Sequence, residues 1–187
     1  MLESLETSMF YILVMACTLC MVLYWVWLGT KKEFVGRLAT SLTIIGVIAS
    51  TVAIILRMIT SGHPPLSNGY EFLLTFCLGI MAVYLYAEFR YKLRSLGAFV
   101  MPIPFLLLMF IIMSMGPEER IAQAVPPALK SQWLTFHVIT AMFAYGAFAV
   151  SFGLGIMYLL KLSKEDTGKK RQPAGDCLAF PCVRSTR

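Results

Sequence analysis

The chain alternates between long uncharged apolar runs and short segments that carry most of its charged residues. Because about 20 apolar helical residues cross the hydrocarbon core of a bilayer, four of the runs are long enough to be transmembrane helices. The remaining run is shorter and is bounded by Glu71 and Glu88, whose carboxylates we expect to reach toward the interfaces. The pattern predicts five spans, at about residues 8–30, 38–57, 70–88, 95–116 and 132–161.

The spans are expected to be helices, because hydrocarbon offers no hydrogen-bond partner to a bare backbone amide. The alternating polar residues of a membrane β-barrel are absent from them. Hydrophobic residues make up 58% of the chain and charged residues 14%, whereas soluble proteins are usually about 45–50% apolar and about 25% charged. The sequence therefore predicts an all-α, polytopic membrane protein, with few residues left for an extramembrane domain.

Most of the Lys and Arg residues fall on one side of the predicted spans. Thirteen of the sixteen lie around residues 31–37, around residues 90–94 or from Lys161 onward, and the other three are Arg57, Arg120 and Lys130. Since basic loops stay in the cytoplasm, the N-terminus is predicted to lie outside and the polar tail, residues 163–187, inside. The net charge of +6 then reflects membrane topology, and we expect no nucleic-acid partner.

Small residues and prolines inside the spans predict packing features. Ala147, Ser151 and Gly155 recur every four residues, a spacing that is typical of a face on which another helix packs closely. Pro102 and Pro104 lack backbone donors, so we expect a kink or unwinding in the fourth span.

The cysteines carry little functional signal. Cys17 and Cys20 form a C-T-L-C pattern in the first span, which we interpret as packing, with a zinc site or a redox pair as alternatives. Met21 rather than His follows, so the pattern is not a c-type haem attachment motif. Cys77 is expected to be a buried apolar residue, and the sequence assigns no role to Cys177 and Cys182 in the tail.

The loop between the second and third spans is the first informative motif. Its Gly and Pro residues predict a tight bend that brings charged side chains together at the membrane surface. One interpretation is structural: Arg57 pairs with Glu71, and Ser67 or Asn68 caps the third helix. The other interpretation is a functional motif. The candidate residues are Arg57, Gly62, His63, Pro65, Ser67, Asn68, Tyr70 and Glu71.

The start of the fifth span is the second informative motif, because His137 lies about one turn below Trp133 in an otherwise apolar helix. A lone histidine in such a place is more often a hydrogen-bonded packing residue. A neutral imidazole beside an apolar wall is also what ligation of haem iron requires. Trp133, Phe136 and Tyr145 are the candidate wall residues, and haem iron at His137 is the metal site that the sequence suggests.

Together, two segments resemble the system II cytochrome c biogenesis proteins of the CcsA/ResC type. They are R-M-I-T-S-G-H-P-P-L-S-N-G-Y-E at residues 57–71 and W-L-T-F-H-V followed by A-Y-G-A-F at residues 133–148. The resemblance implies a membrane protein of the bacterial cytoplasmic membrane or the thylakoid. With a membrane subunit of the CcsB/ResB type, it would deliver haem to the outer face for thioether attachment to apocytochrome c. By the same resemblance, His137 corresponds to the first of two outward-facing axial histidines.

The chain departs from the family pattern in its last part. The family's tryptophan-rich segment, W-G-x-x-W-x-W-D, and its second external histidine follow the helix that corresponds to the fifth span, whereas Trp25, Trp27 and Trp133 are the tryptophans here. The resemblance covers roughly residues 1–165, the family's N-terminal portion, and we expect a haem site and a synthetase activity that are incomplete in this chain. The tail is hypothesised to be a shifted reading frame or a fragment end.

Two alternatives of other classes remain open at this stage. One is a membrane scaffold or interaction subunit that binds no haem. The other is a transporter of a small solute or of haem.

Overall fold

The computed structural model describes residues 2–62, 68–116 and 132–171 of the chain. Within these residues it contains only helices, and five helical segments are long and apolar enough to cross a membrane. The predicted class, an all-α integral membrane protein with about five spans, is confirmed. The elements are α1 (Leu2–Thr30), α2 (Glu33–Ser61), α3 (Gly69–Tyr91), the 3₁₀ turn η1 (Arg94–Leu96), α4 (Gly97–Val100), α5 (Pro102–Ser114) and α6 (Gln132–Arg171).

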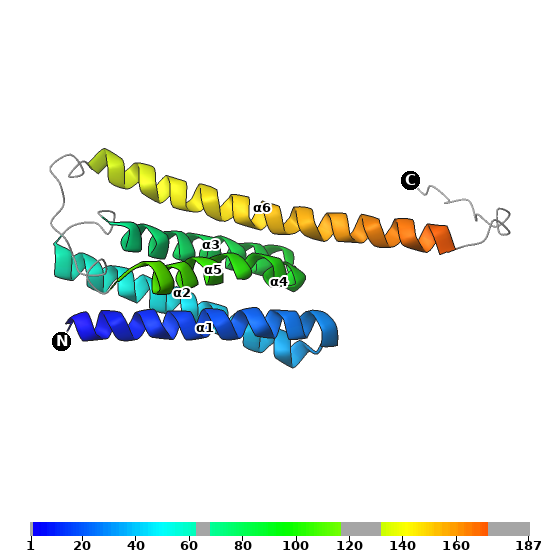
Figure 1. Cartoon of the computed structure of the whole chain (residues 1–187), viewed down its shortest axis with the longest axis horizontal. Helices are drawn as coiled ribbons and strands as arrows, with labels where there is room; N and C mark the ends of the chain where they lie inside the picture. The colour runs from blue at the N-terminus through cyan, green and yellow to red at the C-terminus, as the bar shows by residue number, and fades with distance from the viewer. Residues whose placement is uncertain (1, 63–67, 117–131, 172–187) are drawn as a thin grey trace.

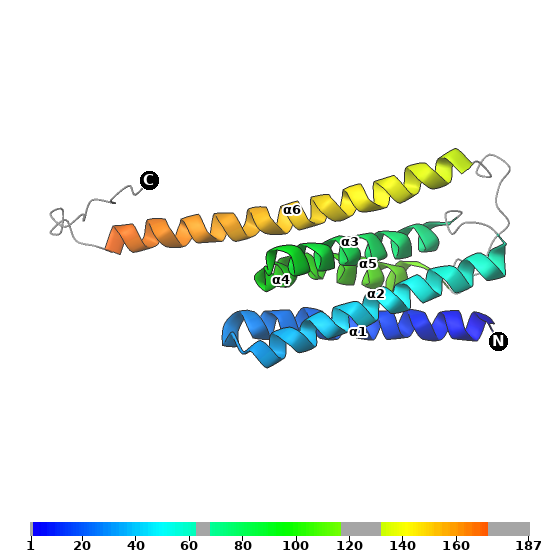
Figure 2. The same ribbon diagram turned by 180° about the vertical axis from the view of Figure 1, so that it is seen from behind.

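Successive membrane-length helices run in opposite directions along the long axis of the molecule (Figure 1). The start of α1, the end of α2 and the starts of α3 and α6 lie at one end, and the connection between α1 and α2 lies at the other. Figure 2 shows the same arrangement from behind. We call the end that holds the start of α1 the N-terminal end. We call the opposite end the basic end, because Lys31 and Lys32 directly follow α1 there and Arg90 and Lys92 lie at the end of α3 there.

Short local signals fix where the helices stop and start. The α2 helix ends at Gly62, whose φ of 70° is the left-handed conformation that glycine adopts without steric cost, and its N–H donates to the carbonyl of Met58. The α3 helix begins at Asn68, whose side-chain oxygen accepts from the N–H groups of Tyr70 (2.8 Å) and Glu71 (3.3 Å). Of the two predicted caps, Asn68 is the one that the structure describes in this role.

The fourth span is built from η1, α4 and α5, and Met101, between α4 and α5, has right-handed helical backbone angles (φ −62°, ψ −27°). Pro102 is the first residue of α5, and Pro104 follows two positions later. Neither proline can donate a backbone hydrogen bond, yet the backbone stays helical across Met101, so the kink expected here stays a prediction.

The α6 helix packs against α3 through two glycines. A Cβ added to Gly146 would lie 2.7 Å from the backbone oxygen of Gly79, a distance that real side chains do not adopt. The small-residue stripe that the sequence predicted as the packing face does not make this contact, because Ala147, Ser151 and Gly155 are exposed. The prediction that this stripe is the packing face is wrong for the described residues, because the helix is rotated so that Gly146 faces the bundle.

The α6 helix is also longer than the predicted fifth span, since it continues to Arg171. Cys177 and Cys182 lie outside the described residues.

Candidate functional site

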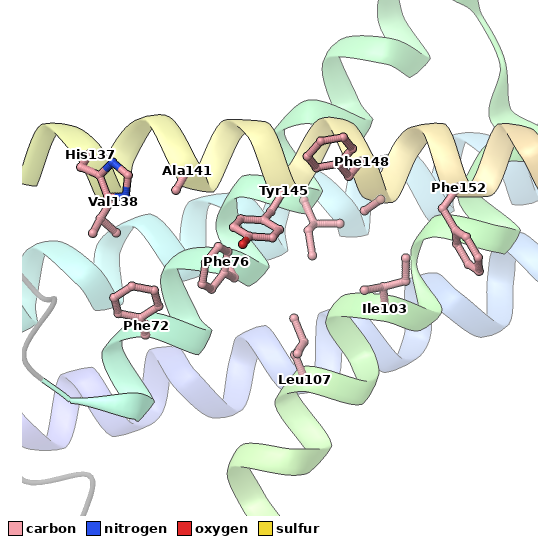
Figure 3. A pocket seen from close by; sticks show the side chains of 12 residues that line it. Phe72, Phe76, Ile103, Leu107, His137, Val138, Ala141, Tyr145, Phe148 and Phe152 are labelled. Atoms are coloured by element: carbon pink, nitrogen blue, oxygen red, sulfur yellow. The ribbon is translucent and has the colours of Figure 1, made fainter.

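An apolar groove of about 710 Å³ runs between α3, α5 and α6. Figure 3 shows it from close by, with His137 and Val138 of α6 at one end and Phe152 at the other. Its walls are mainly aromatic and aliphatic side chains. The lining residues are Phe72, Phe76, Ile80, Ile103, Leu107, His137, Val138, Ala141, Tyr145, Phe148, Ala149 and Phe152.

Aromatic rings from two helices form a continuous wall in this groove. The centroids of Phe72 and Phe76 are 5.3 Å apart, and the rings of Phe76 and Tyr145 meet edge to face at 5.1 Å. Tyr145 in turn lies 6.5 Å from Phe148. Such spacings are those of favourable aromatic pairs, so the wall is a packed surface rather than a set of separate rings.

His137 supplies the one imidazole of the groove's lining, and no lining side chain carries a fixed charge. Among the predicted wall residues, Tyr145 lines the groove together with His137. Trp133 and Phe136 do not line it: their side chains are 82% and 69% exposed. The structure therefore brings together a nitrogen donor and an apolar wall, and the wall comes from α3, α5 and α6 together.

The aromatic residues of α3 were missed by sequence reasoning. Phe72 and Phe76 are one turn apart at the start of α3, directly after the loop motif. Their one-turn spacing puts them on one face of the helix, and that pattern was available in the sequence. The sequence pattern does not show which helix packs against this face of α3, because that depends on how α3 and α6 cross.

A buried ion cluster lies at the N-terminal end, beside the start of α3. The Arg57 Nε donates to Glu71 Oε1 at 2.8 Å, and its Nη1 donates to Glu6 Oε1 at 3.1 Å. All three residues are at least nine-tenths buried, and the guanidinium also lies 5.4 Å from the ring centre of Tyr70. Arg57 and Glu71 form the predicted pair. The contact of Arg57 with Glu6, which is 51 residues away in the sequence, was not predicted.

The acidic residues that bound α3 lie at its two ends but are buried within the bundle. Glu71 is 1% exposed and Glu88 is 4% exposed. Each carboxylate turns into the bundle because an arginine meets it there, Arg57 at one end and Arg94 at the other.

The described part of the loop motif has structural roles. Gly62 ends α2, Asn68 caps α3, Tyr70 packs against Phe10 at 5.7 Å, and Glu71 pairs with Arg57. Together these contacts fix the start of α3 and so position Phe72 in the groove. The remaining motif residues, His63, Pro65 and Ser67, lie outside the described residues.

The cysteines of the spans are buried free thiols: Cys17, Cys20 and Cys77. The Cys20 thiol donates to the carbonyl of Cys17, and that of Cys77 to the carbonyl of Pro104. The part of the chain that the structure describes holds no group of three or more metal-ligating side chains.

Comparison with known proteins identifies the family. Residues 66–179 match the family described as cytochrome c assembly protein, which is more than half of the chain. The chain belongs to this family. Every residue that lines the groove, His137 included, lies inside the region matched to the cytochrome c assembly family.

Individual relatives agree with this assignment. The chain is 31% identical to the cytochrome c biogenesis protein CcsA of Pyropia yezoensis, over 93% of this chain and 55% of the relative. It is 33% identical to CcsA of Guillardia theta over 78% of this chain and 48% of the relative, and 29% identical to CcsA of Gloeobacter violaceus over 76% and 43%. The chain thus spans about half the length of the curated relatives that it matches. No solved structure matches it.

Proposed function

We propose that this chain takes part in cytochrome c assembly by handling haem at the outer face of the membrane, with His137 as an axial ligand. The observation that carries the proposal is the groove, in which one imidazole stands at the end of an aromatic wall within the region matched to the family. An apolar pocket with few convergent polar groups is the usual form of a cofactor site.

The residues of the groove fit one face and one edge of a haem. The imidazole of His137 supplies a nitrogen of the kind that ligates haem iron, and the rings of Phe76 and Tyr145 supply apolar surface beside it. A volume of about 710 Å³ lies in the range of cofactor pockets. When bound, haem supplies the macrocycle that becomes joined to apocytochrome c through thioether bonds.

His137 is the one histidine that the described residues contain, so a second axial ligand would come from elsewhere. We propose that it comes from a membrane partner or from the part of the relatives that this chain does not match. The proposed partners are a membrane subunit of the CcsB/ResB type, which would complete the site, and apocytochrome c, which would receive the haem. The synthetase activity belongs to that complete assembly.

The charge distribution supports an outward-facing groove. The basic residues Lys31, Lys32, Arg90 and Lys92 are next to the ends of α1 and α3, whereas His137 is near the start of α6. The start of α6 lies at the N-terminal end (Figure 1). Since basic segments face the cytoplasm, we propose that the N-terminal end and His137 face outward. The proposed location is the bacterial cytoplasmic membrane, with the thylakoid membrane as the alternative.

Haem retention by the purified chain tests this proposal. Haem is added to the detergent-solubilised protein, free haem is removed by gel filtration, and the retained haem is measured by its absorption. We expect His137→Ala to lose most of the retained haem. Thr140→Ala is the matched control, because Thr140 is also an exposed polar residue of α6 but does not line the groove.

Equal haem retention by the wild type and the His137→Ala variant would overturn the assignment of the ligand. Absence of retained haem in every variant, also with the partner subunit present, would favour a non-haem interaction subunit. Because the His137 side chain is exposed, the substitution is not expected to unfold the protein, and helicity measured by circular dichroism checks this.

A further inference from the structure

The groove between α3, α5 and α6 reaches from the end of a span to its middle. His137 lies at one end of the groove and Phe152 at the other (Figure 3). Fifteen positions of α6 separate them, which is about 22 Å of helix. Both residues belong to the candidate span Trp133–Ser163, and Phe148 is at the middle of that span. We call the end that holds Phe152 the far end, and it lies at the depth of the bilayer centre.

The walls of the groove offer no cation in the part of the chain that the structure describes. The segments of α3, α5 and α6 that form it are residues 72–80, 103–107 and 137–152, and they contain no Lys, Arg, Asp or Glu. Arg57, beside the start of α3, is buried and already bridges two carboxylates. The polar side chains of the lining are those of His137 and Tyr145, and the far end is formed by hydrocarbon and aromatic rings.

Such a lining distinguishes ligands by where their charges lie. A carboxylate that enters a site without a cation or a donor loses its hydration and gains no partner, and this cost is high at the centre of a bilayer. A macrocycle with its carboxylates along one edge can keep that edge at the His137 end, near water, and place its apolar edge in the groove. A macrocycle with carboxylates on opposite edges has no such orientation.

We propose that the far end of the groove selects porphyrins by the position of their carboxylates, so that protoporphyrin is accepted and coproporphyrin is excluded. In protoporphyrin the two propionates are on neighbouring pyrroles and the vinyl groups are apolar. In coproporphyrin further propionates replace the vinyl groups. The specificity-determining residues are Ile103, Leu107, Phe148 and Phe152. This proposal rests on the function proposed above and adds its substrate selectivity, which the apolar far end sets and His137 does not.

The selectivity fits the chemistry of cytochrome c assembly. Thioether bonds are made to the vinyl groups of haem, so a macrocycle that lacks them cannot be joined to apocytochrome c. Exclusion at the groove would keep such a precursor out of the site.

Competition between metal-free porphyrins tests the proposal. Protoporphyrin IX and coproporphyrin III are added in equal amounts to the detergent-solubilised chain, and the bound porphyrins are identified by their masses in native mass spectrometry. We expect at least about tenfold more protoporphyrin than coproporphyrin, because a buried carboxylate without a partner costs at least as much as one lost hydrogen bond to a charged group. Equal binding of the two porphyrins, or binding of neither, would overturn the proposal.

Two alanines of α6 test whether the groove is the binding site. Ala141 lines the groove, so Ala141→Trp fills it and should abolish the binding of protoporphyrin. Ala144→Trp is the matched control, because Ala144 is an exposed residue of the same helix that does not line the groove. Equal amounts of bound protoporphyrin in the two variants would place it elsewhere on the chain or in the detergent, and would overturn the proposal.

A gain of binding gives a test that a misfolded variant cannot imitate. Phe152→Arg places a cation at the far end and should raise the ratio of bound coproporphyrin to protoporphyrin about tenfold, the gain of one hydrogen bond between charged groups. Leu154→Arg is the control, since Leu154 is exposed at the same level of α6 but does not line the groove. An unchanged ratio in Phe152→Arg, or an equal change in both variants, would contradict the proposed selection.

The use of metal-free porphyrins separates this inference from the assignment of the ligand. Without iron the imidazole has no metal to ligate, so His137→Ala should leave the ratio of the two bound porphyrins unchanged. If His137→Ala retains haem like the wild type while the preference for protoporphyrin persists, the ligand assignment fails and the selectivity stands. If His137→Ala loses haem while the wild type binds both metal-free porphyrins equally, the ligand assignment stands and the selectivity fails.

Discussion

Replacement of Arg57 by methionine should strongly destabilise the protein. Arg57 is 3% exposed and bridges two carboxylates, at 2.8 Å to Glu71 and at 3.1 Å to Glu6. Arg57→Met keeps an unbranched apolar side chain in its place but removes the cation that bridges the two buried carboxylates. Removal of one partner of a buried ion pair typically costs about 3–5 kcal/mol, and here two pairs are lost at once.

The free energy of unfolding can be measured by denaturation of the detergent-solubilised chain in SDS, followed by circular dichroism. Arg37→Met is the matched control, because Arg37 is an exposed residue of the same helix and its substitution should change stability by less than about 0.5 kcal/mol. The double variant Arg57→Met/Glu71→Leu removes one of the stranded charges and should recover part of the loss. Equal stability of Arg57→Met and Arg37→Met would refute the reasoning.

Three further substitutions test the packing and the groove. Gly146→Leu should separate α6 from α3, because an added Cβ lies 2.7 Å from the Gly79 carbonyl oxygen, and proteolysis of α6 should then become faster. Gly155→Leu is the control: no atom lies within 4 Å of its added Cβ, so this variant should be as resistant to proteolysis as the wild type. Asn68→Ala should cost about 1 kcal/mol of stability through loss of the α3 cap, measured by SDS denaturation, and Asn68→Asp should retain most of it; equal losses in both would contradict the cap. Phe76→Ala should lower haem retention several-fold without a change in helicity, and unchanged retention would remove this ring from the proposed haem wall.

The sequence predicts the helices well because their signals are local. Each apolar run between charged segments corresponds to a helical segment long enough to cross a membrane. The Arg57–Glu71 pair was also predictable, since the two residues are only 14 positions apart, at the end of one predicted helix and the start of the next.

What the sequence did not predict depends on how the helices rotate and cross. The stripe of Ala147, Ser151 and Gly155 has the right spacing for packing, yet Gly146 is the residue that meets α3. Glu6 forms an ion pair with Arg57, although the two residues are far apart in the sequence and belong to no common motif. Tertiary contacts decide such cases, because several faces of an apolar helix satisfy the same pattern.

The candidate site was predicted in part for the same reason. His137 and Tyr145 lie on one helix, two turns apart, so the sequence placed them together. The wall from Phe72 and Phe76 belongs to another helix and came into view only with the crossing of α3 and α6.

The measurement that tests the central claim most directly is the pulsed electron paramagnetic resonance spectrum of ferric haem bound to the chain with ¹⁵N-labelled histidine. The chain has two histidines, His63 and His137. If His137 ligates the iron, the ¹⁵N coupling is present in the wild type, persists in His63→Ala and disappears in His137→Ala. Persistence of the coupling in His137→Ala, or its loss in His63→Ala, would contradict the assignment.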